Sequence, residues 1–129
     1  VAWFTGADNI ATIKVAFSED SGVTFGPAFQ VDSGKSVGRV GTLMLATGEA
    51  LISWVEWTSD GEVLMLCRAT KNDGCVARQT ITEHAASGSF NFPKLARSSD
   101  TIYLAWTQPI DSEAGFSTIR MVVLELSNY

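Results

Sequence analysis

The chain has 129 residues, of which 46% are hydrophobic, 10% aromatic and 18% charged, and its net charge is −5. This length allows one compact domain, and this composition excludes a disordered tail. The acidic balance repels phosphate backbones and anionic lipid, so we expect neither nucleic acid nor membranes as partners. No apolar run reaches the ~18 residues that are needed to span a bilayer.

Three segments of the chain resemble one another, and each is an apolar run around a tryptophan. The tryptophans are Trp3, Trp54 and Trp106, which are 51 and 52 residues apart. A polar, turn-prone stretch and a second apolar run follow each of them. Short runs rich in Val, Ile, Leu and aromatic residues, separated by Gly, Asp, Asn and Ser, predict strands and turns with essentially no helix. The further apolar runs are residues 13–17, 40–45, 63–67, 92–96 and 119–124.

Several of these runs are apolar at consecutive positions, for example Leu43-Met44-Leu45 and Val63-Leu64-Met65-Leu66. A strand that is apolar on both sides must be covered on both faces, as in a sheet stacked between two others. Four-stranded units that repeat every 40 to 50 residues or so are typical of propeller blades. We therefore predict an all-β fold, a partial β-propeller of about two and a half four-stranded antiparallel blades. A two-sheet sandwich is the main alternative, but it predicts a cleaner alternation of polar and apolar residues and no repeat.

We expect a single partial propeller over residues 1–129. Residues 1–33 supply the second to fourth strands of one blade, 37–83 a whole blade, and 90–126 the first three strands of the next, with a longer connection from Pro109 to Phe116. The chain has no initiator Met and begins within an expected strand, which indicates a piece of a longer or processed protein. Its first residues do not have the features of a signal peptide.

One turn of the first unit has a distinctive spacing, S-x-D-x-G-x-T-F, formed by Ser18, Asp20, Gly22, Thr24 and Phe25. The oxygens of Ser18 and Asp20 can accept hydrogen bonds from nearby backbone N–H groups and tighten the turn. Gly22 permits the positive φ that the reversal needs. We expect Phe25 to pack under the hairpin as a plug, so these five residues are predicted to be structural.

A weaker copy of this turn, Thr70-Lys71-Asn72-Asp73-Gly74, stands at the matching place in the second unit. The two turns begin 15 and 16 residues after their tryptophans. With these motifs the chain resembles the bacterial sialidase-like proteins with BNR, or Asp-box, repeats. The segments 38–43 and 92–96 are similar to inner strands of that family. The resemblance implies a propeller of about six blades, of which this chain holds fewer than half, and a periplasmic or extracellular location.

The resemblance also implies what a catalytic site would need. Sialidases of this family grip a carboxylate with three arginines, and they use a tyrosine–glutamate nucleophile pair and an aspartate acid/base. Their arginine motif is (F/Y)-R-I-P at the start of an inner strand. Here Gly38-Arg39-Val40-Gly41 keeps only the arginine, and Asn91-Phe92-Pro93 keeps a proline and no arginine. We therefore assign no catalytic residue.

Loops before the inner strands and after the second strands should share one face of a propeller. The candidates for ligand binding on that face are Arg39, Glu56, Trp57, His84 and Gln108. A partly exposed Trp57 among polar groups would suit stacking against a sugar. The alternatives remain open: a structural ion pair for Arg39, packing between blades for Trp57, and a solvated loop position for His84.

The two cysteines, Cys67 and Cys75, and the one histidine cannot complete a zinc site without a carboxylate. No metal or other cofactor is predicted. The cysteines flank the weaker turn, and both a pair of part-buried thiols and a disulfide across the turn fit the sequence.

The first functional hypothesis is a non-catalytic sialidase-like segment that serves as a scaffold or as a module for carbohydrate or another ligand. The second is part of a glycoside hydrolase, of the exo-sialidase kind, whose other catalytic residues lie in other blades. The third is a small lectin-like protein that assembles a propeller from copies. Because a partial propeller exposes apolar blade faces, we also expect self-association.

Overall fold

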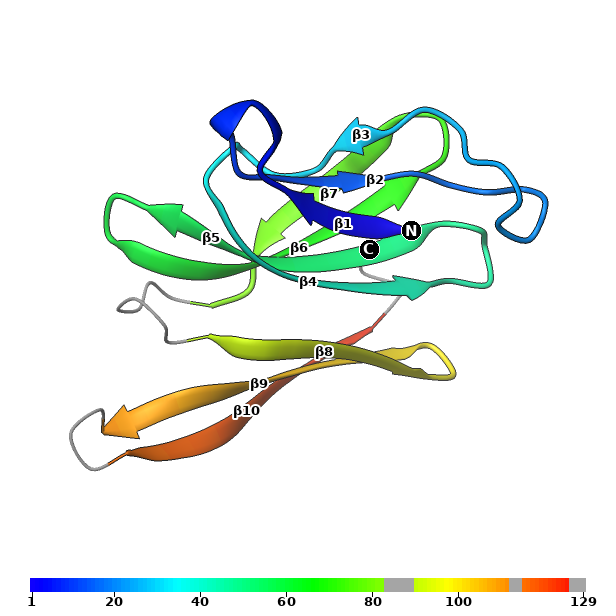
Figure 1. Ribbon diagram of the computed structural model, residues 1–129. Helices are drawn as coiled ribbons and strands as arrows, with labels where there is room; N and C mark the ends of the chain where they lie inside the picture. The colour runs from blue at the N-terminus through cyan, green and yellow to red at the C-terminus, as the bar shows by residue number, and fades with distance from the viewer. Residues whose placement is uncertain (83–89, 112–114, 126–129) are drawn as a thin grey trace.

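The computed structural model describes residues 1–82, 90–111 and 115–125, and these form three antiparallel sheets. The sheets lie in layers, with the middle sheet between the first and the last (Figure 1). Within the described ranges the single helical element is a short 3₁₀ turn, η1 (Ala7–Asn9). No helix in those ranges is long and apolar enough to cross a membrane.

The first sheet has the order β1-β2-β3 and the last sheet the order β8-β9-β10, while the middle sheet has the full order β4-β5-β6-β7. Every neighbouring pair is antiparallel and consecutive in the chain, as in the blades of a propeller. The strands are β1 (Ala2–Thr5), β2 (Thr12–Val15), β3 (Phe29–Gln30), β4 (Ser36–Met44), β5 (Ala50–Thr58), β6 (Gly61–Thr70), β7 (Gly74–Thr80), β8 (Asn91–Ser98), β9 (Thr101–Asp111) and β10 (Phe116–Glu125).

The middle sheet explains why its apolar runs do not alternate. Successive residues of a strand point to opposite faces, and in β5 every residue from Ala50 to Glu56 is buried. Ile52 and Trp54 pack into a cluster with residues of the first sheet, and Leu51 and Val55 pack into clusters with residues of the last sheet. The expected sheet, covered on both faces, is therefore present, and the partial propeller is confirmed.

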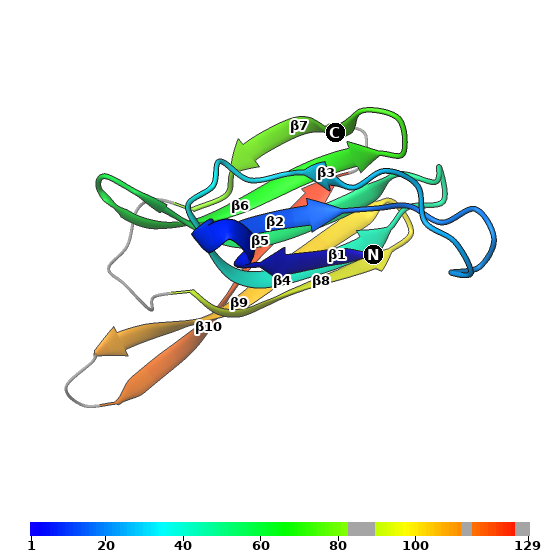
Figure 2. The same ribbon diagram turned by 45° about the horizontal axis from the view of Figure 1, so that its top comes forward.

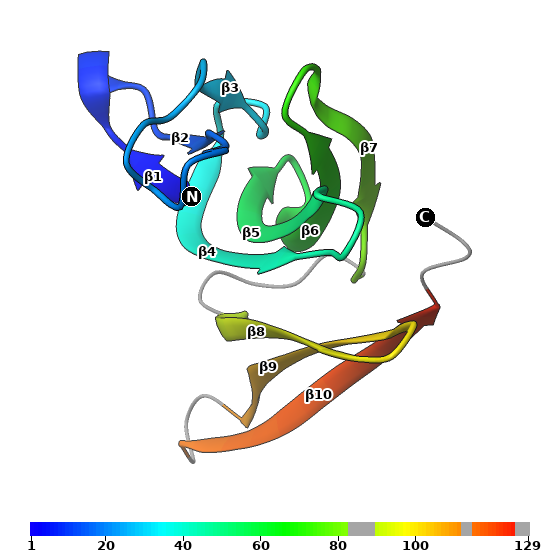
Figure 3. The same ribbon diagram turned by 90° about the vertical axis from the view of Figure 1, so that its right-hand side faces the viewer.

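The connections between strands lie at the two edges of the molecule where the strands begin and end. The long β2–β3 connection lies at one end with the β4–β5 and β8–β9 turns, and the β5–β6 turn lies at the opposite end (Figure 2). A view roughly along the strands separates the three layers and places β8–β10 on one side of the middle sheet and β1–β3 on another (Figure 3). The loops that we expect to face a ligand and the Ser18–Phe25 turn are thereby separated by the length of a strand.

One expected connection is wrong. We expected a loop from Pro109 to Phe116, but β9 continues through Pro109 and Ile110 as far as Asp111. The proline is tolerated because it lies at an irregularity of the β9–β10 pairing, where the register shifts between Phe116 and Ser117. Residues 112–114 lie outside the described part.

The two cysteines form a disulfide. Cys67 of β6 and Cys75 of β7 have Cα atoms 5.9 Å apart, within the range for such a bond. The bond crosses the hairpin whose turn is the weaker copy of the Ser18–Phe25 turn. The second outer hairpin is therefore held covalently, whereas the first is held by the side-chain hydrogen bonds described below.

Candidate functional site

The inner strands of the middle and last sheets, β4 and β8, each contain a β-bulge close to their first residue. Both bulges begin opposite the residue that follows the repeat tryptophan and end opposite the residue that precedes it. Arg39 and Phe92 are therefore equivalent residues in successive repeats. The flanking pairs are Gly38↔Val55 and Gly41↔Ser53 in the middle sheet, and Asn91↔Thr107 and Lys94↔Ala105 in the last sheet.

Both bulge residues adopt a left-handed backbone conformation, which is unfavourable for residues other than glycine. The φ angle is +57° at Arg39 and +49° at Phe92. Such a residue costs about 1–3 kcal/mol and persists only where its surroundings hold it. Bulges re-aim side chains and are common beside functional sites. Two bulges occur at one repeat position, near the first residues of β4 and β8. We call this end of the strands the bulge end and take it as the candidate site.

The two bulge side chains converge on each other. The guanidinium carbon of Arg39 lies 5.7 Å from the centre of the Phe92 ring, a cation–π arrangement. Arg39 also donates a hydrogen bond from Nη1 to the side-chain oxygen of Asn91. The Phe92 side chain remains 73% exposed, so one face of an aromatic ring and a positioned guanidinium are presented together.

Glu56 was expected to face a ligand, but in the structure its side chain is buried. The residue is only 7% exposed, and its carboxylate accepts hydrogen bonds from Trp54 Nε1 at 2.7 Å and from the backbone N–H and hydroxyl of Ser33. A buried indole N–H needs an acceptor, and Glu56 provides it from the same face of β5. The side chain therefore fastens the link between the first and middle sheets, and its role as a ligand contact stays a prediction.

The remaining candidates are placed as follows. Trp57 is 40% exposed, and its backbone N–H donates to the carbonyl of Lys35 at 2.9 Å. Gln108 is half-buried and pairs with Thr118 in β10. Gln108 follows Thr107, the β9 partner of Asn91, so it belongs to the same end as Arg39. His84 lies outside the described residues.

Sequence reasoning missed Asn91 and Phe92 as site residues. Their signal was present in the repeat, because Phe92 stands 14 residues before Trp106 and Arg39 stands 15 before Trp54. The carboxylate of Asp32 was also missed. It is 5% exposed, and neither oxygen has a hydrogen-bond partner among the described residues. Within the described ranges no three His, Cys, Asp or Glu residues gather closely enough to hold a metal ion.

The opposite end carries the Ser18–Phe25 turn, whose hydrogen bonds are local. The Ser18 hydroxyl oxygen accepts from the Gly22 N–H at 2.7 Å, and Asp20 accepts from the Thr24 N–H at 2.8 Å and from its hydroxyl at 2.5 Å. The bonds from the Thr24 side chain and backbone, followed by that from Ser18, lower the pKa of Asp20 to about 2. Gly22 has φ +89°, as the reversal requires. These donors and acceptors pair with one another within the turn, so we assign the turn a structural role.

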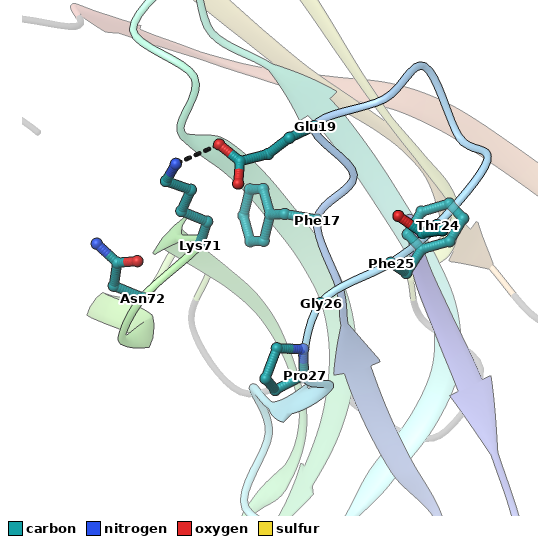
Figure 4. Close-up of a pocket in the computed structure, with 8 residues that line it drawn as sticks. All are labelled: Phe17, Glu19, Thr24, Phe25, Gly26, Pro27, Lys71 and Asn72. Atoms are coloured by element: carbon teal, nitrogen blue, oxygen red, sulfur yellow. Dashed lines mark hydrogen bonds and ion pairs between the residues drawn. The ribbon is translucent and has the colours of Figure 1, made fainter.

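Phe25 does not plug the hairpin as expected, since its side chain is 49% exposed. It lines a hollow of about 370 Å³ between the β2–β3 connection and the β6–β7 turn. Figure 4 shows this hollow, with Phe17 and Pro27 on its wall and the Lys71 ammonium directed at the Glu19 carboxylate. The two charged groups that line it are already paired with each other, so the bulge end is the stronger candidate.

No family model matches the chain, and no curated protein matches it. One similar solved structure is a GH43 endo-arabinanase from Bacillus licheniformis, with a TM-score of 0.47 and 15% sequence identity. The match covers 92% of this chain and 43% of that one, so this chain spans less than half of its length. Membership of the sialidase-like family stays a prediction. The chain itself, by its stacked antiparallel sheets, is a partial β-propeller.

Proposed function

We propose that this chain is a non-catalytic, ligand-binding segment of a propeller, and that its bulge end binds a carbohydrate through Arg39 and Phe92. The observation that carries the proposal is the pair of strained bulges at one repeat position, with their side chains in contact. An exposed aromatic ring can stack on the apolar face of a sugar. A guanidinium beside it can donate paired hydrogen bonds to a carboxylate or to vicinal hydroxyls.

Polar groups around the two bulge residues support this chemistry. Asn91 fixes the Arg39 guanidinium from one side, which lowers the entropy that is lost when a ligand binds. Trp57 and Gln108 lie at the same end and add a partly exposed aromatic ring and an amide. An acidic sugar would use the positive charge of Arg39, and a neutral sugar would use the ring and the amides.

Three buried acids at the bulge end support a non-catalytic role. Asp32, Glu56 and Glu62 are 5%, 7% and 2% exposed, and Glu56 is held by Trp54 and Ser33. Hydrolysis of a glycoside ordinarily needs two carboxyl groups that reach the scissile bond. Carboxylates buried to this extent do not meet that requirement. The competing hypothesis, a hydrolase completed by other blades, requires accessible acids, either the exposed Asp60 of the β5–β6 turn or acids of other blades.

The test is a titration of immobilised chain against a glycan panel that includes sialylated and neutral oligosaccharides. We expect binding by wild type and at least a tenfold loss in Arg39→Ala and Phe92→Ala, with Val23→Ala as the matched surface control. Val23 is 81% exposed and belongs to the opposite end. Equal binding by wild type and both variants would contradict the site, and turnover of a fluorogenic sialoside by this chain would contradict the non-catalytic role.

We further propose a periplasmic or extracellular location. The Cys67–Cys75 disulfide supports it, because such bonds form and persist in oxidising compartments. Intact-mass measurement after alkylation of protein from the native host would find no labelled thiol in this case. Two alkylated cysteines in that sample would argue for a reducing compartment.

A further inference from the structure

The hollow beside the Ser18–Phe25 turn has two walls that belong to neighbouring sheets (Figure 4). One wall is the β2–β3 connection, which supplies Phe17 and Phe25, and the other is the β6–β7 turn, which supplies Lys71 and Asn72. The volume of the hollow, about 370 Å³, lies in the range of small-ligand sites. Aromatic rings and polar groups therefore line a space that is large enough for a ligand.

The first wall is held by hydrogen bonds, and the ring that it carries stays half exposed. Asp20 accepts from the backbone N–H and the hydroxyl of Thr24, and the Gly26 N–H donates to the Phe17 carbonyl at 2.9 Å, which closes the loop. These bonds fix the residues on either side of Phe25, whose side chain is nevertheless 49% exposed. A ring that is held in place before a ligand arrives binds it with a smaller loss of entropy.

The second wall is held covalently, and close packing fixes its distance from the first. The Cys67–Cys75 disulfide lies at the base of the 71–73 turn. Gly74, at the start of β7, lies so near Phe29 of β3 that a Cβ on Gly74 would stand 2.6 Å from the Cβ of Phe29. Only glycine, which has no Cβ, allows this approach. The spacing of the walls is therefore set by packing between the first and middle sheets.

An ion pair crosses between the walls and keeps capacity for further hydrogen bonds. Lys71 Nζ contacts Glu19 Oε1, while the two side chains remain 52% and 75% exposed. An ammonium has three donors and a carboxylate has about four acceptor positions, so their mutual contact uses only part of each. The amide of Asn72, on the same wall as Lys71, adds donors and an acceptor. These groups can exchange hydrogen bonds with a polar ligand at little cost, since an exposed ion pair contributes little to stability.

A second hollow adjoins the first at this ion pair. Its volume is about 330 Å³, and it shares Phe17, Glu19 and Lys71 with the first hollow. Its other lining residues include Met44, at the end of β4, and Glu49 of the β4–β5 turn. The two hollows together have room for a chain of sugar units that lies across the ion pair.

We propose that the two hollows form a second carbohydrate site, which binds a neutral oligosaccharide and is separate from the bulge end. The Phe25 ring stacks on the apolar face of a sugar, and the groups of the ion pair bind its hydroxyls. The charges that line the hollows are two carboxylates, Glu19 and Glu49, against one ammonium, Lys71. This balance, in a chain of net charge −5, disfavours acidic sugars. The bulge end differs in chemistry, because it presents the cation of Arg39.

The test is a titration of the isotope-labelled full chain with neutral tetrasaccharides of glucose, mannose, galactose and N-acetylglucosamine, followed by the NMR shifts of backbone amides. We expect at least one of them to produce saturable shifts in residues 17–27 and 70–73. No such shifts with any tetrasaccharide would overturn the proposal. Shifts confined to residues 38–41 and 91–94 would also overturn it, while supporting the bulge end, so the two sites succeed or fail separately.

Variants of Phe25 separate stacking on a ring from simple apolar contact. Phe25→Ala and Phe25→Leu should each weaken binding at least tenfold, whereas Phe25→Trp should retain it because it keeps a flat ring. Phe116→Ala, which removes a 68% exposed ring from β10, is the matched control and should bind as wild type does. An unchanged circular dichroism spectrum shows that each variant is folded. Equal binding by wild type and Phe25→Ala, or an equal loss in Phe116→Ala, would contradict the site.

Discussion

The guanidinium of Arg39 stacks over the ring of Phe92, and these two residues hold the same position in successive repeats. Each lies in a β-bulge with a positive φ, and the bulges turn both side chains toward one another. Neither residue is needed to cover the apolar clusters of the stack. Strain kept at an exposed position, without a gain in packing, is the main physical reason for placing a binding site there.

The strain at Phe92 predicts an unusual ranking of two variants. Both Phe92→Ala and Phe92→Gly remove the same ring, which is largely exposed, but only glycine adopts φ near +49° without cost. We expect Phe92→Gly to be more stable than Phe92→Ala by about 1 kcal/mol. Urea unfolding followed by circular dichroism measures the difference. Equal stabilities would show that the bulge is relaxed in solution.

The bonds of Glu56 predict a clear loss of stability. Glu56→Ala leaves the buried N–H of Trp54 and the Ser33 hydroxyl without their acceptor, and we expect a cost of about 2 kcal/mol. Glu56→Gln should cost less, because its amide oxygen still accepts from Trp54. Urea midpoints of the two variants test this order. If neither variant changes the midpoint while glycan binding falls, Glu56 is a ligand contact after all.

The lowered pKa of Asp20 predicts a pH dependence of stability with a defined direction. Its pKa falls from 3.8 to about 2 in the folded chain, so the unfolded chain binds the proton more tightly. The contribution of Asp20 to stability is therefore present above pH 4 and is lost as the pH falls toward 2. Asp20→Asn should be less stable than wild type at pH 6, and the gap should narrow by pH 2.5. Urea midpoints at the two pH values give the comparison, and a gap independent of pH would contradict the assignment.

The disulfide predicts the response to reduction. Opening the bond between Cys67 and Cys75, which are eight residues apart, should cost about 2.5 kcal/mol through the entropy of the unfolded chain. Thermal unfolding with and without reductant measures the loss. The Cys67→Ala/Cys75→Ala variant, which has no thiols, should be insensitive to reductant. A wild type that is equally insensitive would show that the bond contributes nothing to stability.

The sequence alone was sufficient to predict the layered all-β fold. The repeat of Trp3, Trp54 and Trp106 and the unbroken apolar runs depend on local patterns, because side chains alternate along any strand and a strand apolar on both sides requires two covered faces. The hydrogen bonds of the Ser18–Phe25 turn follow for the same reason, since their donors and acceptors lie within a few residues of each other.

The site depended on contacts between residues far apart in the chain. Arg39 and Phe92 are 53 residues apart, and only the register of β4 on β5 and of β8 on β9 makes their bulges equivalent. Glu56 looked like a surface acid because its burial comes from the link that crosses from the first sheet. The sequence by itself determined which segments are strands and that their sheets stack, since hydrophobic periodicity is local. The tertiary structure decided which side chains meet at the bulge end, since those contacts are set by strand register and by packing between layers.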